Sequence, residues 1–331
     1  MFEKILIANR GEIAVRIIRA CRNMGIQSVA VYSKEDQNSL HTQLADQRIC
    51  IGEGPAKNNY LNMDQLITAA INTGADAIHP GYGFLSENSE FVRRCKENGI
   101  AFIGPEADVI DRMGNKSHAR KTMMDAGVPV VPGTREPVYD AETGKKLARE
   151  IGYPVIIKAS SGGGGKGMRV ATSEDEFEFE FGLAQRESAN AFGDDTMYIE
   201  RYIEKPRHVE IQIMADSFGH VVALGDRDCS VQRNHQKLIE ESPSPAISDE
   251  TRAEMNRCAI LAAKTVQYTN AGTIEFIVDP QGHFYFMEMN TRIQVEHGVT
   301  EMVTGTDLII EQIRVAAGEP LSFTQEDVKP R

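Results

Sequence analysis

The first third of the chain alternates between short apolar runs and longer segments with the spacing of amphipathic helices. Residues 4–8 (KILIA) form an apolar run, and residues 12–25 carry apolar side chains at helical intervals and end in glycine, a frequent helix C-cap. Further short apolar runs lie at 28–32, 77–79 and 100–103. Strands that alternate with helices in this way predict a parallel α/β sheet.

The pattern changes near Met113-Gly114, and we place a domain boundary there. A helical segment at 116–126 follows, and a strand-like run at 153–158 leads into a stretch where five of the six residues 162–167 are glycine. Short strand-like segments flank an acidic helical piece at 173–191. A small unit of this kind with a glycine-rich tip suggests a lid.

Composition and charge narrow the function classes. The chain has 331 residues, with 36 Lys and Arg against 48 Asp and Glu, so its formal charge is −12. Such a charge repels nucleic acid and anionic membranes, and an anionic substrate must then be held by local cations. The five cysteines form no CxxC pair, which favours reduced thiols over a disulfide framework or a zinc site. The N-terminal apolar stretch is too short for a signal peptide or a membrane span, so we expect a cytoplasmic protein.

Neither glycine motif matches a common nucleotide-binding loop. The early strand-turn-helix has only Gly11 where a dinucleotide-binding loop needs three glycines, which argues against a nicotinamide cofactor. The run at 162–167 lacks the Gly-Lys-Ser/Thr of a Walker A loop, so it is either a flexible turn or another kind of phosphate cover. Lys158 and Lys166 favour the phosphate cover, because ammonium and backbone N–H groups can close over a polyphosphate.

Two strand-like runs, 273–278 and 283–289, are joined by Asp-Pro-Gln-Gly, which predicts a hairpin. A loop of two or four residues pairs Glu275 with Phe286 and sets two carboxylates and an amide on one face: Glu275, Glu288 and Asn290. A solvated face is one interpretation. Like-charged carboxylates repel unless a cation joins them, so we favour a site for Mg²⁺ or Mn²⁺.

A third polar cluster spans residues 227–237 (RDCSVQRNHQK). It is either a solvated loop or part of a substrate site. Without a CxxC or HxxxH pattern, His235 suits hydrogen bonding to a substrate better than zinc.

Several stretches together resemble the biotin carboxylase family of ATP-grasp enzymes over nearly the whole chain. They are KILIANRGEIAVRIIRA, AIHPGYGFLSEN, FIGP, MGNKSHAR, YPVIIKASSGGGGKGM, PRHVEIQI, RDCSVQRNHQK and EMNTRIQVEH. The resemblance implies a Rossmann-like N-terminal (pre-ATP-grasp) domain at 1–114 and an ATP-grasp domain at 115–331 with a glycine-rich lid at about 131–203. Family members continue through a C-terminal domain that this sequence lacks.

The resemblance also implies roles for individual residues, with ATP and Mg²⁺ or Mn²⁺ as cofactors. Those implied for ATP are Lys116, Lys158, Gly162, Gly163, Gly164, Gly165, Lys166, Gly167, Glu200, Arg201, Ile203, His208, Gln232 and His235. Those implied for the metal are Glu275, Glu288 and Asn290. Those implied for bicarbonate are Lys237, Arg292, Gln294 and Val295, with Glu296 as general base and Lys237 and Arg292 also catalytic. Tyr82 matches a residue near the biotin ring.

The implied activity is ATP-dependent carboxylation of biotin on the biotin carboxyl carrier protein, with bicarbonate as carbon source and carboxyphosphate as intermediate. This is the first half-reaction of acetyl-CoA carboxylase in fatty acid biosynthesis. The alternatives are the biotin carboxylase domain of a pyruvate or acyl-CoA carboxylase, a non-catalytic ATP-binding fragment, and a different ATP-grasp ligase that acts on an amine or a carboxylate. Expected partners are the carrier protein, the carboxyltransferase subunits and, in the full-length protein, a second copy in a homodimer.

Overall fold

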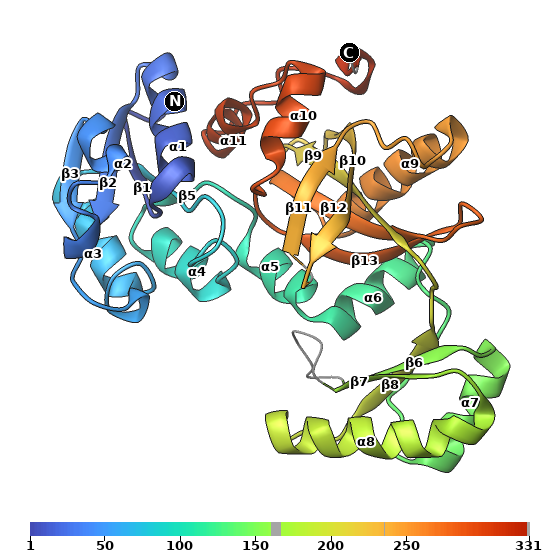
Figure 1. Cartoon of the computed structure of the whole chain (residues 1–331). Coiled ribbons are helices and arrows are strands. Elements are labelled where there is room, and N and C mark those ends of the chain that lie inside the picture. Colours follow the sequence, from blue (N-terminus) through green and yellow to red (C-terminus); the bar gives the residue numbers. More distant parts are fainter. Residues whose placement is uncertain (160–166, 235, 330–331) are drawn as a thin grey trace. The chain divides into compact units, whose positions relative to one another are not determined.

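A computed structural model describes residues 1–159, 167–234 and 236–329 (Figure 1). Its contacts divide the chain into two compact units. Unit 1 contains Met1–Val128, Arg207–Phe276 and Glu288–Arg331, and unit 2 contains Pro129–Pro206 and Ile277–Met287. The domain boundary at residue 114 and the lid at about 131–203 stay predictions, because a division by contacts does not follow sequence domains.

The N-terminal part of unit 1 is a five-stranded parallel sheet with the strand order β3-β2-β1-β4-β5. Its strands are β1 (Lys4–Ile7), β2 (Gln27–Tyr32), β3 (Gln47–Cys50), β4 (Ala77–His79) and β5 (Ala101–Phe102). The parallel α/β sheet predicted from the alternation of strands and helices is confirmed.

Helices cover both faces of this sheet. Ile5 and Ile7 of β1 pack against the apolar side of α1, whereas Leu6 packs in a separate core with α3 and α4. The helix α1 ends at Gly25, whose φ of +71° and N–H bonds to the preceding turn make it the predicted C-cap. The helices are α1 (Gly11–Met24), α2 (Leu40–Leu44), α3 (Met63–Thr73), α4 (Ser89–Glu97), α5 (Ala107–Gly114) and α6 (Lys116–Asp125), with 3₁₀ turns η1 (Lys34–Asp36) and η2 (Ala56–Asn58).

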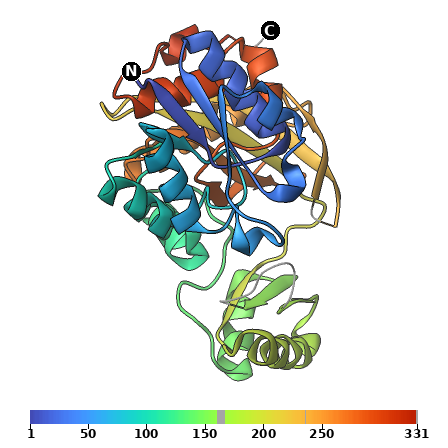
Figure 2. The ribbon, with the colours of Figure 1, turned by 90° about the vertical axis from the view of Figure 1, so that its left-hand side faces the viewer.

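A second five-stranded sheet has the strand order β11-β10-β9-β12-β13; most of it belongs to unit 1, and its residues 277–287 belong to unit 2. Its strands are β9 (Arg207–Ala215), β10 (Val221–Arg233), β11 (Gln236–Glu241), β12 (Asn270–Val278) and β13 (Phe284–Asn290). The helices are α9 (Asp249–Thr265), α10 (His297–Thr304) and α11 (Leu308–Ala316), with the 3₁₀ turn η3 (Gln325–Asp327). Helix α11 lies beside α1, and apolar residues of both helices share one core (Figure 2).

Unit 2 is a small α/β layer with an antiparallel three-stranded sheet in the order β7-β6-β8. The strands are β6 (Val155–Ala159), β7 (Met168–Ala171) and β8 (Met197–Arg201), and the helices are α7 (Ala141–Ile151) and α8 (Glu174–Phe192). Val155 and Ile157 of β6 pack against Phe177 and Phe181 of α8. The predicted acidic helix is therefore present, with its aromatic side chains in the core of the unit.

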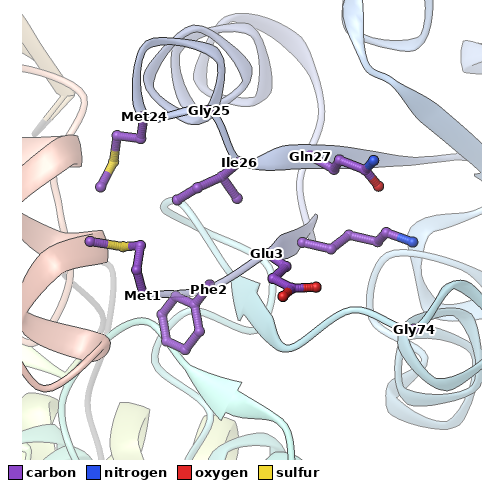
Figure 3. Close-up of a pocket in the computed structure, with 9 residues that line it drawn as sticks. Met1, Phe2, Glu3, Met24, Gly25, Ile26, Gln27 and Gly74 are labelled. Atoms are coloured by element: carbon purple, nitrogen blue, oxygen red, sulfur yellow. The ribbon is translucent and has the colours of Figure 1, made fainter.

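A hollow of about 580 Å³ lies where β1 and β2 begin (Figure 3). It is lined by Met1, Phe2, Glu3, Lys4, Met24, Gly25, Ile26, Gln27 and Gly74. Ligands of open parallel sheets bind at the opposite, carboxyl ends of the strands, and none of the predicted site residues lines this hollow. Among the described residues, no helix has both the length and the apolar character that crossing a membrane requires.

Candidate active site

The hairpin between β12 and β13 closes differently from the prediction. The N–H of Asp279 donates to the carbonyl of His283 at 2.8 Å, and the N–H of Gly282 donates to the carbonyl of Asp279 at 3.0 Å. Gly282 has a φ of +87°, as in a three-residue connection made of a type I turn and a bulge. The predicted loop of two or four residues is therefore wrong, and the pairing of Glu275 with Phe286 that depended on it stays a prediction.

Strand β13 then changes the phase of its alternation. Phe286 is buried (4% exposed), Met287 is 43% exposed, and Met289 is buried again (5%), so the buried positions slip by one residue along the strand. Asn290, the next residue, is also buried (8% exposed).

The shared face of Glu275 and Asn290 is nevertheless confirmed. The side-chain amide of Asn290 donates to Oε1 of Glu275 at 2.8 Å. Oε2 of Glu288, two residues before Asn290, lies 3.3 Å from Nζ of Lys116. Two of the oxygen ligands predicted for a metal, Glu275 and Asn290, thus lie together, and the predicted place of Glu288 beside them stays a prediction. This donor set is one that Mg²⁺ binds well, since carboxylate and amide oxygens are hard ligands. The metal-binding role itself stays a prediction.

Lys237 of β11 joins three carboxylates. Its Nζ donates to Oε1 of Glu296 at 2.6 Å and to Oε1 of Glu275 at 3.0 Å, and it also donates to Glu210 of β9. Burial alone would lower the pKa of Lys237, but the charges of Glu210, Glu275 and Glu296 outweigh it and raise the pKa above its ordinary value. The ammonium therefore stays charged and holds the proposed general base, Glu296, next to the proposed metal ligand Glu275.

His208, predicted at the nucleotide, lies against Glu275, and Gln232, also predicted there, contacts His208. The amide of Gln232 donates to Nδ1 of His208 at 3.1 Å, which leaves Nε2 of His208 to carry the proton, 3.2 Å from Oε2 of Glu275. Burial would raise the pKa of Glu275, but the contact with His208 and the charge of Lys237 keep it below its usual range. Glu275 is thus an ionised, nearly buried carboxylate.

Arg292, a predicted bicarbonate residue, is held by Glu87. Its Nε donates to Oε2 of Glu87 at 2.8 Å, and its Nη2 donates to Oδ1 of Asn290 at 3.1 Å. Glu87 lies between β4 and α4, and it also accepts the backbone N–H of Thr291 at 3.2 Å. Val295, another residue predicted for bicarbonate, is 65% exposed.

The loop that carries Tyr82 is fixed from the N-terminal sheet. The hydroxyl of Tyr82 donates to Glu12 of α1, and the side-chain amide of Asn9 donates to the carbonyls of Tyr82 and Pro80 at 2.7 and 2.8 Å. Burial, together with the carboxylate of Glu12, raises the pKa of the Tyr82 hydroxyl. The phenol therefore stays protonated and is an anchored donor.

Several residues predicted for ATP belong to unit 2: Lys158, Gly167, Glu200, Arg201 and Ile203. Lys158 of β6 forms an ion pair with Glu200 of β8, while Arg201 is exposed and Ile203 is buried. Gly167 has a φ of +70°, and its carbonyl accepts the N–H of Ala159 at 2.9 Å. The remaining predictions lie outside the described residues: Gly162, Gly163, Gly164, Gly165, Lys166 and His235.

Three charged residues of the site were not singled out from the sequence: Arg227, Glu210 and Glu87. Arg227 begins the polar cluster 227–237, which is a signal in the sequence. Glu210 lies two residues after His208 on β9, so the strand period places both on one face. Glu87 reaches Arg292 from 205 positions away in the sequence, and no local pattern indicates that contact. Two groups of described residues have ligand atoms within 4.8 Å of one another: His208, Glu210 and Glu275, and Glu210, Cys229 and Glu296.

Comparison with known proteins identifies the family. Residues 1–110 match the family described as biotin carboxylase, N-terminal domain, and residues 115–324 match the one described as carbamoyl-phosphate synthase L chain, ATP binding domain. Biotin carboxylase 1 of Bacillus subtilis (strain 168) is 58% identical over 330 residues, which cover 99% of this chain and 73% of that protein.

Solved structures agree with these matches. A biotin carboxylase from Campylobacter jejuni in a β-γ-ATP complex has a TM-score of 0.92 at 51% identity, and the alignment covers 100% of this chain and 74% of that one. The biotin carboxylase domain dimer of the Hydrogenobacter thermophilus 2-oxoglutarate carboxylase, in complex with MgADP, ADP and bicarbonate, has a TM-score of 0.90 at 49% identity over 100% and 73% of the two chains. Fold, sequence and the grouping of lysine, arginine and carboxylates on one sheet agree, and the chain belongs to the biotin carboxylase family of ATP-dependent ligases.

Proposed function

We propose that this chain uses ATP and bicarbonate to carboxylate biotin on a biotin carboxyl carrier protein. The observation that carries the proposal is the position of Lys237, whose ammonium contacts Glu296 and Glu275 at once. An anion that enters between Lys237 and Arg292 meets a carboxylate able to take its proton on the same side. The relatives whose structures contain β-γ-ATP, MgADP or bicarbonate support the choice of substrates.

In the proposed first step, Lys237 and Arg292 hold bicarbonate and Glu296 accepts its hydroxyl proton. The oxygen so freed attacks the γ-phosphorus of ATP, the bond to the β-γ bridging oxygen breaks, and ADP leaves with the electron pair. The products are carboxyphosphate and ADP. Bicarbonate is a weak nucleophile while protonated, so the carboxylate of Glu296 must be ionised and close to it.

In the second step carboxyphosphate breaks into CO₂ and phosphate. The phosphate takes the proton from the ureido nitrogen of biotin, and this nitrogen attacks CO₂ to form carboxybiotin. We propose that Tyr82, anchored by Glu12 and Asn9, borders the biotin ring.

Glu275, Glu288 and Asn290 would hold the divalent cation, with Lys116 beside them. A bound Mg²⁺ or Mn²⁺ neutralises charge on the phosphoryl group that is transferred. The side chains themselves already keep one another in place: Asn290 donates to Glu275, and Lys116 pairs with Glu288. ATP is further assigned to His208, Gln232 and His235, and in unit 2 to Lys158, Glu200, Arg201, Ile203 and the glycines of the predicted lid.

Within the family we propose the acetyl-CoA carboxylase role, with a homodimer as the working assembly and the carboxyltransferase subunits as downstream partners. The second candidate is the biotin carboxylase part of a carboxylase that acts on a 2-oxo acid or another acyl-CoA, which the 2-oxoglutarate carboxylase relative favours. Carrier proteins from both kinds of system separate the candidates, since the cognate carrier should give the lower KM.

The test of the proposed function is ADP release from Mg-ATP that depends on both bicarbonate and free biotin. Glu296→Gln should remove the bicarbonate-dependent rate, since an amide cannot accept the proton, and should leave nucleotide binding intact by calorimetry. Glu97→Gln, the same change on the exposed end of α4, is the matched control and should keep the full rate. Stimulation by ammonia or glutamine instead of biotin would reject biotin carboxylation in favour of another ATP-grasp ligase.

A further inference from the structure

Arg227 of β10 is fully buried (0% exposed) directly behind the candidate active site. A guanidinium has five N–H donors, and all of them are used here. Nε donates to Glu210 at 2.7 Å, and the two Nη atoms donate to the side chains of Gln212, Thr273, Gln294 and Thr300 at 2.6 to 3.3 Å. These partners come from β9, β12, the segment after β13, and α10. An arginine bound on every side cannot change its position, so it is a fixed point for the partners that do face the site.

One of these partners, Gln294, faces the site with its other end. Nη2 of Arg227 donates to Oε1 of Gln294 at 2.6 Å, while Nε2 of Gln294 donates to Oε1 of Glu275 at 3.0 Å. If the amide were turned over, its N–H groups would point at a guanidinium, which only donates, and its oxygen at a carboxylate, which only accepts. Both neighbours therefore select the same orientation of the amide.

We propose that Arg227 is a positioning residue for bicarbonate, which it serves by holding Gln294 so that N–H donors and not the amide oxygen face the anion. The inference rests on the proposed function, because it takes bicarbonate as the anion beside Glu275 and Glu296. Among the hydrogen bonds of the described residues, Gln294 uses one of its two amide N–H groups for Glu275. The second N–H points to the same side and is the donor for bicarbonate.

Arg227→Lys tests the proposal because it keeps the positive charge but loses the five N–H donors of the guanidinium. An ammonium has three donors and cannot reach acceptors on five sides, so Gln294 is released to rotate. We expect the KM for bicarbonate to rise about tenfold to a hundredfold, the usual cost of one buried hydrogen bond to a charged group, and the KM for Mg-ATP to change far less. A KM for bicarbonate equal to that of the wild type would overturn the proposal.

Thr300→Val is the matched control. It removes another buried hydrogen bond of the same guanidinium, at 2.8 Å, but on Nη1, which does not contact Gln294. Its thermal midpoint should fall while its KM for bicarbonate stays near the wild-type value. An equal rise of this KM in both variants would mean that Arg227 has only a structural role.

The double variant Arg227→Lys/Gln294→Leu separates the two roles further. If Arg227 acts through Gln294, its replacement adds little to the KM for bicarbonate once Gln294 is already a leucine. A full additional rise, of the size seen with Arg227→Lys alone, would contradict action through Gln294.

A readout that needs no turnover distinguishes failure of this inference from failure of the proposed function. In wild-type protein labelled with ¹⁵N-glutamine, and with Gln294→Leu for assignment, the side-chain amide of Gln294 should exchange its hydrogens far more slowly than that of exposed Gln43. Exchange as fast as at Gln43 would overturn the positioning role even in an active enzyme. Slow exchange in a protein without bicarbonate-dependent ATP turnover would refute the proposed function and leave the hold of Arg227 on the amide standing.

Discussion

Replacing Lys237 with glutamine should remove one of the two positive charges that balance the buried carboxylates of the candidate site. In the wild type one ammonium, 18% exposed, lies within hydrogen-bond distance of Glu210, Glu275 and Glu296. These three carboxylates are balanced by Lys237 and Arg227, which leaves one net negative charge, and the variant has two. Breaking a buried ion pair by removal of one partner costs about 3–5 kcal/mol, so we expect the free energy of unfolding to fall by about that amount at pH 8.

The stability that these carboxylates contribute should change with pH in opposite directions in the wild type and in the variant. In the wild type, Arg227 and Lys237 keep the pKa of Glu210 below its ordinary value despite burial, and the pKa of Glu275 is lowered as well. Groups with a lowered pKa stabilise the fold above the pKa of the unfolded chain, and this contribution disappears as the pH falls through the folded pKa. In Lys237→Gln the burial and mutual repulsion dominate, the carboxylates protonate more easily, and the difference in stability should shrink between pH 8 and pH 5.

The assay is urea unfolding at several pH values, with and without Mg²⁺. Because the variant leaves oxygen ligands without a cation, 10-fold increases in Mg²⁺ should raise its stability more than that of the wild type. Lys34→Gln is the control, since Lys34 also pairs with a glutamate but both side chains are 65% exposed, and it should change little at any pH. A stability gap for Lys237→Gln that is constant from pH 8 to pH 5 would refute the reasoning.

Two further predictions concern backbone and anchoring. Gly167→Ala should lower the thermal midpoint of unit 2 more than Gly193→Ala, because both residues have a φ of +70° but only a Cβ at Gly167 would come within 2.7 Å of the Cβ of Ala159. Tyr82→Phe removes the hydroxyl that donates to Glu12, so the pKa of Glu12, which this bond lowers, should rise toward its ordinary value in an NMR titration, and the KM for free biotin should rise. An unchanged carboxyl titration would show that the bond does not form.

The sequence predicted the architecture well where local signals agree with burial. The apolar run 4–8 became the central strand of the first sheet because alternate residues face two cores: Ile5 and Ile7 on one side and Leu6 on the other. Gly25 ended the first helix as predicted, since its φ of +71° suits glycine. In such segments the local pattern and the packing require the same structure.

The hairpin shows why register is harder to predict than the strands themselves. Asp-Pro-Gln-Gly indicated a turn correctly, but the connection has three residues, with Gly282 in the left-handed region, and not the two or four that the prediction assumed. In a regular strand that slip would turn Glu288 to the other face. The hydrogen bond from Asn290 to Glu275 still puts these two side chains on one face, and no sequence signal indicates how the hairpin achieves this.

The residues that the sequence did not reveal are those whose role depends on distant contacts. A buried arginine and a buried glutamate look like ordinary charges in a polar stretch, and only the packed sheet brings Arg227 to Gln294, 67 positions away. Glu87 reaches Arg292 across an even longer separation. Side chains that face a ligand occur in dense polar motifs, whereas those that hold them in place are single residues spread over several elements.

The net charge of the chain makes the few cations of the candidate site important for anion binding. A protein with a net charge of −12 repels ATP and bicarbonate at long range, so their binding depends on a few cations in fixed places. Yet Lys237, Arg292 and Lys116 each contact carboxylates that partly cancel their attraction for an anion. Arg227 supplies positive charge to the same cluster from a position that no ligand reaches, and it offsets Glu210 without taking up space in the site. A neutral residue at 227 should therefore weaken anion binding even if Gln294 kept its orientation, because Lys237 alone would then balance three carboxylates.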